Sequence, residues 1–143
     1  MKVAVIDGQG GGIDKSLIRC IKKRFGSNVQ VIALGTNFGA TSAMIKEGAD
    51  KGASGENAIV VTSQNVDIIL GPLGIIISNA MLGEITPAMA VAITSSEAKK
   101  ILIPLNICNV SIIGTEEYKL SQLLDIAINT IEELLNAKIG KIE

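Results

Sequence analysis

The sequence contains no histidine and no tryptophan, and both absences limit the chemistry open to the chain. Histidine is the commonest general base and the commonest metal-binding side chain, so the usual histidine-dependent catalysis and zinc sites are excluded. Aromatic residues make up only 2% of the chain. A surface on which successive nucleic-acid bases stack is therefore not expected.

The chain also lacks a strong excess of either charge. Its 13 basic and 14 acidic residues give a net charge of -1, whereas nucleic-acid binding needs a basic face, so nucleic acid is not an expected partner. The two cysteines, Cys20 and Cys108, form neither a metal-binding spacing nor a disulfide framework. We interpret them as small buried residues in a reducing cytoplasm, and we predict no metal site.

Long apolar runs are missing as well. The most apolar stretch, VDIILGPLGIIISNAML over residues 66–82, is too short and too interrupted by polar residues, glycine and proline to span a membrane. No signal peptide precedes the first apolar run. The 143 residues, 48% of them hydrophobic, predict one cytoplasmic domain over residues 1–143 that does not bind membranes.

Apolar runs alternate with segments of helical spacing, which is typical of a parallel sheet covered on both faces. Five strands are predicted, at residues 2–7, 29–34, 57–62, 67–71 and 99–106, with a possible sixth edge strand at 109–114. The interpretation is a three-layer, doubly wound, Rossmann-like α/β domain with a mostly parallel sheet of 5–6 strands in the order 3-2-1-4-5.

Helices are predicted at residues 15–25, 40–49, 78–96 and 120–134. The third should be capped by Ser78 or Asn79 and broken near Ile85, because Pro87 cannot continue a helix. The last has the broadest apolar stripe, widened by Leu124, Ile128 and Leu135, and this stripe could pair in a dimer.

The first predicted strand is followed by four glycines in five residues, Gly8, Gly10, Gly11 and Gly12, with Gln9 between them. A strand, a glycine turn and a helix together form an anion site, because the first helical N–H groups have no internal partner. The Rossmann fingerprint G-x-G-x-x-G is only partly met, since its third glycine falls on Ile13.

Two other readings of the glycine turn remain open. A phosphate-binding P-loop would use Lys15 and Ser16, but Asp14 then stands where the pattern needs glycine, and a carboxylate repels phosphate. The turn could also be purely structural, with Asp14 capping the helix and the glycines allowing close packing. The number of glycines exceeds what such a turn requires, and this excess favours a ligand.

In open parallel sheets, ligands bind beyond the carboxyl ends of the strands, where the strand order reverses. The sequence delivers several polar or glycine residues to that edge. Besides the glycine turn, the candidate binding residues are Thr36, Asn37, Gly71, Pro72, Gly74, Asn79 and Asn106. Gly71 to Gly74 should form a second glycine turn that faces the first across the crevice.

Carboxylates suited to acid–base chemistry are few at this edge. Asp7, directly after the first strand, and Glu84, on the third predicted helix, are the two candidates, although a surface role for Glu84 is the simpler reading. Lys15 could neutralise a phosphate, whereas Lys99 and Lys100 precede a strand and so lie at the opposite edge. No nucleophile with an adjacent base is evident.

The segments AVIDGQGGGI, VIALGTN, ASGENAIVV, GPLGIIISNAMLGEITPAMAVAI and KKILIPLN resemble an uncharacterised family of small bacterial proteins, common in anaerobic Gram-positive bacteria. The resemblance covers nearly the full chain and implies a Rossmann-like fold. It implies no established activity and transfers no catalytic residues. It leads us to expect glycine where this chain has Asp14, and a less bulky residue than Phe38.

Two functions follow as hypotheses. The chain binds a nucleotide, a dinucleotide or a phosphorylated small molecule at the first glycine turn, or it is a non-catalytic, homo-oligomeric interaction module without a ligand. Both fit a cytoplasmic protein, and the identity of a cofactor is not specified by the sequence.

Overall fold

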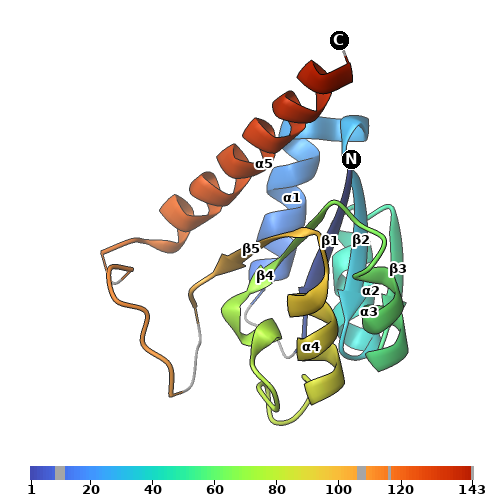
Figure 1. The fold of residues 1–143 in the computed structure, drawn as a ribbon, viewed down its shortest axis with the longest axis vertical. Coiled ribbons are helices and arrows are strands. Elements are labelled where there is room, and N and C mark those ends of the chain that lie inside the picture. The colour runs from blue at the N-terminus through green and yellow to red at the C-terminus, as the bar shows by residue number, and fades with distance from the viewer. Residues whose placement is uncertain (9–11, 106–108, 116, 143) are drawn as a thin grey trace.

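A computed structural model describes residues 1–8, 12–105, 109–115 and 117–142 of the chain. Its centre is a five-stranded, fully parallel sheet in the order β3-β2-β1-β4-β5 (Figure 1). The strands are β1 (Lys2–Asp7), β2 (Gln30–Gly35), β3 (Lys51–Ser54), β4 (Ile68–Pro72) and β5 (Lys99–Ile103). The predicted fold class and strand order are confirmed.

The described residues also form five α-helices and two single turns of 3-10 helix, which lie between the strands except for the last helix, which follows β5. They are α1 (Ile13–Phe25), η1 (Gly26–Asn28), α2 (Phe38–Lys46), α3 (Glu56–Thr62), η2 (Leu73–Ile76), α4 (Pro87–Ser95) and α5 (Leu120–Ile142). Apolar residues of α1, α2 and α5 cover one face of the sheet. Those of α3, η2 and α4 cover the other, which completes the three layers.

The strand β1 lies in the middle of the sheet and is covered by helices on both faces. Five of its six side chains are buried, because one half of them faces α1 and the other half faces α4. Only a strand covered on both faces tolerates such a continuous apolar run. The strand order reverses between β1 and β4, so the carboxyl ends of these two strands mark the expected ligand crevice.

The third strand is not where the sequence predicts it. Residues 57–62, NAIVVT, form most of α3, and the strand is instead the preceding KGAS of β3. This edge strand has no large apolar side chain. It pairs through its backbone with β2, and α2 packs close above Gly52, where a Cβ would lie 2.7 Å from the side chain of Ile45. Backbone pairing and close approach leave no apolar signal in the sequence.

The third predicted helix is also shorter than expected. Residues 78–86 form an irregular loop, and α4 begins at Pro87, capped by the side chain of Thr86 rather than by Ser78 or Asn79. Proline is well suited to the first helical position because its missing N–H would have no partner there. The predicted break before Pro87 is therefore the start of the helix. Of the sixth predicted strand, the described residues 109–114 form no strand.

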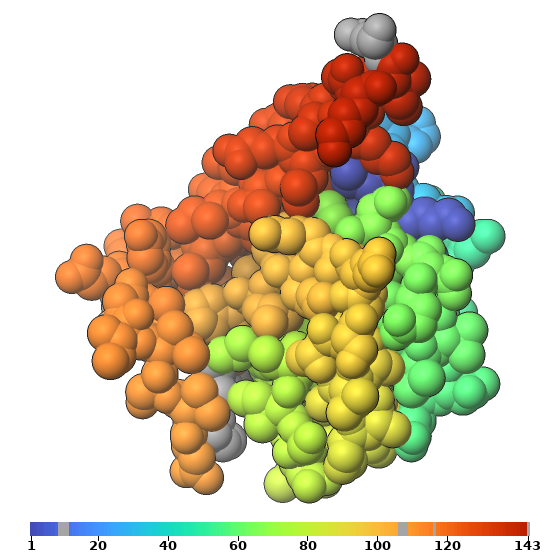
Figure 2. Space-filling view, viewed as in Figure 1, coloured from blue at the N-terminus to red at the C-terminus, as the bar shows by residue number. Residues whose placement is uncertain are grey.

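The segment before α5, drawn in orange in Figure 2, protrudes from the rest of the molecule. It carries the most exposed large apolar side chain, Ile113, at 94% exposure. By contrast, Leu124, Ile128 and Leu135 of α5 pack against the core that α1 shares with the sheet. The stripe expected to pair in a dimer is thus used within the chain, and homo-oligomerisation stays a prediction.

No helix among the described residues is both long and apolar enough to cross a membrane.

Candidate functional site

The first glycine turn leads from the end of β1 into α1, as the sequence predicts. Gly12, with a φ of 76°, adopts the left-handed backbone that favours glycine and directly precedes the helix. The N–H of Ser16 makes the first helical bond, to the carbonyl of Gly12 at 3.2 Å. The amides of Ile13 to Lys15 therefore belong to the set that no helix satisfies internally.

On one side of this turn, toward β4, the molecule is closely packed. A Cβ on Gly71 would lie 2.3 Å from the carbonyl oxygen of Ile6, so β4 and β1 approach each other only because Gly71 has no side chain. A Cβ on Gly8 would lie 2.8 Å from the sulfur of Met81, and one on Gly74 3.6 Å from the Met81 methyl carbon. The Met81 side chain thus lies between the two glycine turns.

The loop that delivers Met81 has an unusual backbone. Asn79, Met81 and Leu82 have φ values of 67°, 58° and 55°, in a region that residues with a side chain seldom adopt. The Asn79 N–H donates to the carbonyl of Ile85, and the Asn79 carbonyl accepts from the Gly83 N–H, so the loop closes on itself. Such strain persists only where surrounding contacts fix it. We call the region around Gly8, Gly71, Gly74 and Met81 the closed side of the turn.

A polar contact anchors the same loop above β2. One carboxylate oxygen of Glu84 accepts hydrogen bonds from the Thr36 hydroxyl at 2.9 Å and from the Asn37 side-chain amide at 2.6 Å. Glu84 thereby ties the β4–α4 loop to the β2–α2 turn across the end of β1. It lies in a loop rather than on a helix, and this geometry gives it a positioning role.

On the other side of the turn, toward α2, there is open space. A cavity of about 250 Å³ lies between the amino-terminal ends of α1 and α2. Its described lining is Gly8, Gly12, Asp14, Lys15, Asn37, Gly39, Ala40 and Ala43. The positive ends of two helix dipoles meet there, beside the ammonium group of Lys15. We call this region the open side of the turn.

A second hollow of about 360 Å³ adjoins the first. The two share Lys15, Gly39 and Ala43, so they lie next to each other along α1 and α2. The second is lined in addition by Phe38, Ser42, Lys46 and Glu47. Of these, Glu47 forms an ion pair with Arg19 at 3.0 Å, so its charge is compensated.

Asn37 stands at the rim of the open side and caps α2. Its side-chain oxygen accepts from the Ala40 N–H at 2.9 Å, while its side-chain amide donates to Glu84. Asparagine is among the residues preferred at this position because it satisfies an otherwise unpaired helical N–H. Both ends of the side chain are therefore engaged, and its predicted contact with a sugar requires one of them to change partner.

Asp7 is a buried carboxyl group at the base of the turn. It is 2% exposed, and its Oδ1 accepts from the Gly8 N–H at 2.7 Å, whereas its Oδ2 is buried without a hydrogen-bond partner among the described residues. Burial raises the pKa of Asp7 to about 7, and the carboxylates of Asp14 and Glu84 add to the rise. A group that titrates near neutrality keeps Asp7 a candidate for acid–base chemistry.

Asp14 does not cap α1, since the residue before the helix is Gly12 and no side chain bonds there. It is instead a buried side chain, 4% exposed, in the wall of the cavity. The cavity therefore combines one buried carboxyl group with one exposed ammonium group. A ligand that fits both must carry an anionic part and hydrogen-bond donors.

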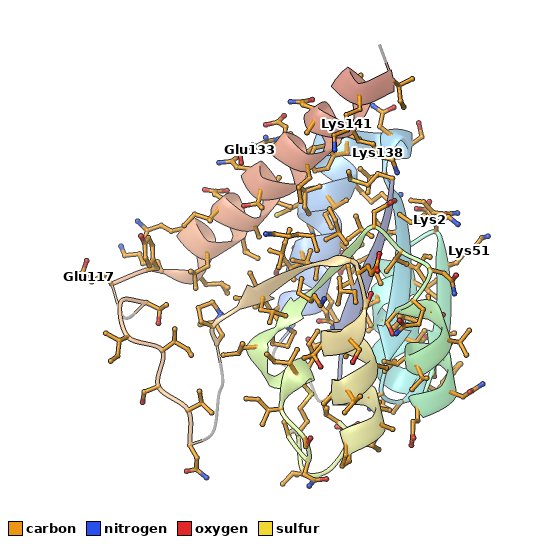
Figure 3. The ribbon with its side chains drawn as sticks, viewed as in Figure 1. Lys2, Lys51, Glu117, Glu133, Lys138 and Lys141 are labelled. Carbon is orange, nitrogen blue, oxygen red and sulfur yellow. The ribbon has the colours of Figure 1, made fainter. Side chains whose placement is uncertain are left out.

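Most other lysines lie far from the cavity. Lys2, Lys51 and Lys99 begin strands and so occupy the opposite edge of the sheet, as predicted for Lys99. Figure 3 shows Lys138 and Lys141 of α5 at that same end of the molecule. Lys138 pairs there with Asp67 at 3.1 Å. Lys15 lies in the first turn of α1, beside the cavity, whereas Lys46 lies in the last turn of α2.

The predicted site residues divide between the two sides. Gly8, Gly12 and Asn37 line the open cavity, whereas Gly71 and Pro72 are buried in β4 and Gly74 faces Met81. Thr36 contacts Glu84, and Asn79 lies exposed in the strained loop. Gln9, Gly10, Gly11 and Asn106 lie outside the described residues.

Sequence reasoning missed the residues that shape the groove, mainly Phe38, Gly39 and Ala43, and it missed Met81. A usable signal was present in TNFGA, because an asparagine cap followed by glycine and alanine places small residues on the first turn of a helix. No comparable signal marks Met81, whose position depends on an irregular loop.

The sheet order, the glycine turn and the adjoining cavity define a Rossmann-like α/β domain with a ligand-sized groove beside its first helix. The chain belongs to the family described as a domain of unknown function, DUF3842, whose model matches residues 2–136. The resemblance to an uncharacterised family is thereby confirmed, while the bacterial origin of the chain stays a prediction. Comparisons with curated proteins and with solved structures give no significant match.

Proposed function

We propose that the protein binds a phosphorylated sugar or nucleotide on the open side of its first glycine turn. The observation that carries this proposal is the cavity of about 250 Å³ between the amino-terminal ends of α1 and α2, with Lys15 in its wall. The backbone N–H of Asp14 contacts the buried Asp7 carboxyl group, but the N–H groups of Ile13 and Lys15 have no partner within the helix, and together with the helix dipole they favour a phosphate group at this position.

The buried carboxyl group of Asp14 narrows the class of ligand. A bare phosphate ion would gain from Lys15 and the amides but would be repelled by Asp14, which lines the same cavity. A sugar phosphate meets both demands, because its hydroxyl groups donate to Asp14 while its phosphate group faces Lys15. The same requirement is met by a nucleotide or a dinucleotide.

A thermal-shift screen with inorganic phosphate, ribose 5-phosphate, AMP, ATP, NAD and NADP tests the proposal. A ligand that binds only the folded state increases the free energy of unfolding by mass action, by about 2.7 kcal/mol at a ligand concentration of 100 Kd, and so raises the melting temperature. We expect ribose 5-phosphate and at least one nucleotide to raise it, and inorganic phosphate to act more weakly.

Two variants assign the effect to the cavity. Gly39→Leu places a side chain in the wall of both hollows, and Lys15→Glu reverses the charge, so both should reduce affinity at least about tenfold. Lys23→Glu makes the same charge change at the exposed far end of α1 and should bind like the wild type. Flat melting curves with every compound, or equal losses in Lys23→Glu and Lys15→Glu, would contradict the proposal.

A further inference from the structure

Phe38 is an exposed aromatic side chain in a chain that has almost none. The sequence contains two phenylalanines and one tyrosine, and Phe25 is buried against the sheet. Phe38 is 79% exposed at the first position of α2, where it lines the second hollow. Nothing in the packing of the described core requires this ring, since Phe38 belongs to neither apolar cluster.

The surroundings of the ring suit a flat, uncharged group attached to a phosphate. Gly39, Ser42 and Ala43 line the same hollow as the ring with small residues. Lys15 and Lys46 flank it with positive charge, and Glu47 is neutralised by Arg19. The second hollow, of about 360 Å³, falls within the range of about 300–1,000 Å³ that is typical of small-molecule sites.

The closed side excludes the alternative path for such a ligand. A nucleotide crossing from β1 toward β4 would have to displace Met81 from between Gly8 and Gly74. The groove along α1 and α2 needs no such displacement, because the hollows share Lys15, Gly39 and Ala43. A phosphate beside Lys15 in the first hollow thus leaves the second hollow open to the rest of the molecule.

We infer that the second hollow is a base-binding subsite in which the ring of a nucleotide base stacks on Phe38, so that the ligand is a nucleotide rather than a simple sugar phosphate. This inference rests on the proposed function. The scarcity of aromatic residues argues against a platform for a nucleic-acid strand, but a single mononucleotide needs only one ring.

The experiment compares AMP with ribose 5-phosphate, which carries the same sugar and phosphate without the base. Isothermal titration should show that the wild type binds AMP between about 5-fold and 100-fold more tightly, as base stacking on one aromatic side chain typically contributes. Phe38→Ala should abolish this preference and leave the affinity for ribose 5-phosphate unchanged. The exposed Val61→Ala on α3 serves as the matched control and should keep the preference.

A second variant provides a direct optical signal. Because the chain has no tryptophan, Phe38→Trp introduces its single indole, whose fluorescence should be quenched by AMP and unaffected by ribose 5-phosphate. Equal binding of the two compounds by the wild type, or a preference that survives Phe38→Ala, would overturn the inference and leave the proposed function standing. Failure of these two compounds and of every other compound in the thermal-shift screen would overturn the two together.

Discussion

The two sides of the first glycine turn use the same kind of residue for opposite purposes. On the closed side, Gly71 lets β4 approach the backbone of β1, and Gly8 leaves room for the side chains of Thr36 and Met81. On the open side, Gly12 and Gly39 border a cavity, and a Cβ on Gly12 would meet nothing within 4 Å. A glycine therefore indicates close packing in one direction and access for a ligand in the other.

This difference separates a packing role from a binding role within one loop. Where a missing side chain is replaced by a neighbouring atom at contact distance, the glycine serves the fold. Where the space stays empty and backbone amides border it, the glycine leaves the access that the proposed ligand needs. The comparison can be tested by adding a side chain on each side in turn and by removing the Met81 side chain from the closed side.

The largest expected effect comes from adding one methyl group to each side. Gly71→Ala places a Cβ 2.3 Å from the carbonyl oxygen of Ile6, so β1 and β4 must separate. We expect a loss of more than about 5 kcal/mol, comparable with the whole stability of a small domain. Gly39→Ala places its Cβ 3.3 Å from the side-chain oxygen of Asn37, beside open space, and should stay within about 1 kcal/mol of the wild type.

Urea unfolding followed by circular dichroism measures both changes, and the expression of folded Gly71→Ala is the first readout. Gly39→Ala is the matched control, because it makes the same substitution on the other side of the turn. Similar losses in the two variants would show that the sides do not differ as the structure indicates.

The next effect is a dependence of stability on pH, which reports how completely water is excluded from Asp7, the residue next to Gly8. Burial raises the pKa of Asp7 from 3.8 to about 7 in the folded protein, so the folded state holds a proton that the unfolded state has released. Stability should therefore fall as the pH rises from about 4 to 7 and then stay level. The shift corresponds to a loss on the order of 4 kcal/mol.

Asp7→Asn removes the charge and keeps the acceptor for the Gly8 N–H, so its stability should be nearly constant over this range. The chain has no histidine, the side chain that otherwise titrates there, so the background is low. Asp67 and Asp50, whose pKa values are lowered, lose their stabilising effect only below about pH 4. The control is Asp125→Asn, on the exposed face of α5, which should keep the pH dependence of the wild type. If the stability of the wild type does not change between pH 4 and 7, water reaches Asp7 in the folded protein.

Much of the fold could be predicted from the sequence, because buried parallel strands have a direct apolar signature. The runs that became β1, β2, β4 and β5 are continuous and apolar, and their alternation with helices fixes the order of the sheet. The strand β3 has no such run, since its KGAS is held by backbone pairing at the edge. The β-branched residues of NAIVVT were assigned to a strand in its place, although Ile59 buries its side chain from a helix.

The candidate site was predicted in part, for a related reason. The sequence locates the glycine turn and the capping asparagine, because both depend on local backbone chemistry. It does not show which side of the turn is filled, because Met81 reaches Gly8 from a loop that lies more than 70 residues further along the chain and contains three left-handed residues. The prediction that Gly71 and Gly74 face the first turn is compatible with the structure, but the space between the turns holds Met81.

The smallest expected effect comes from emptying the closed side. Met81→Ala removes the thioether that separates Gly8 from Gly74 and should cost about 2 kcal/mol in urea unfolding, near the lower end for a core methionine because Met81 is only half-buried. Leu82→Ala is the matched control, since Leu82 shares the left-handed backbone of the same loop but is 91% exposed, and it should change stability by less than about 0.5 kcal/mol. If the two variants lose equal stability, Met81 does not fill the space between the turns in solution. In that event the crevice between β1 and β4 is open as well, and a ligand could enter the protein from either side of its first helix.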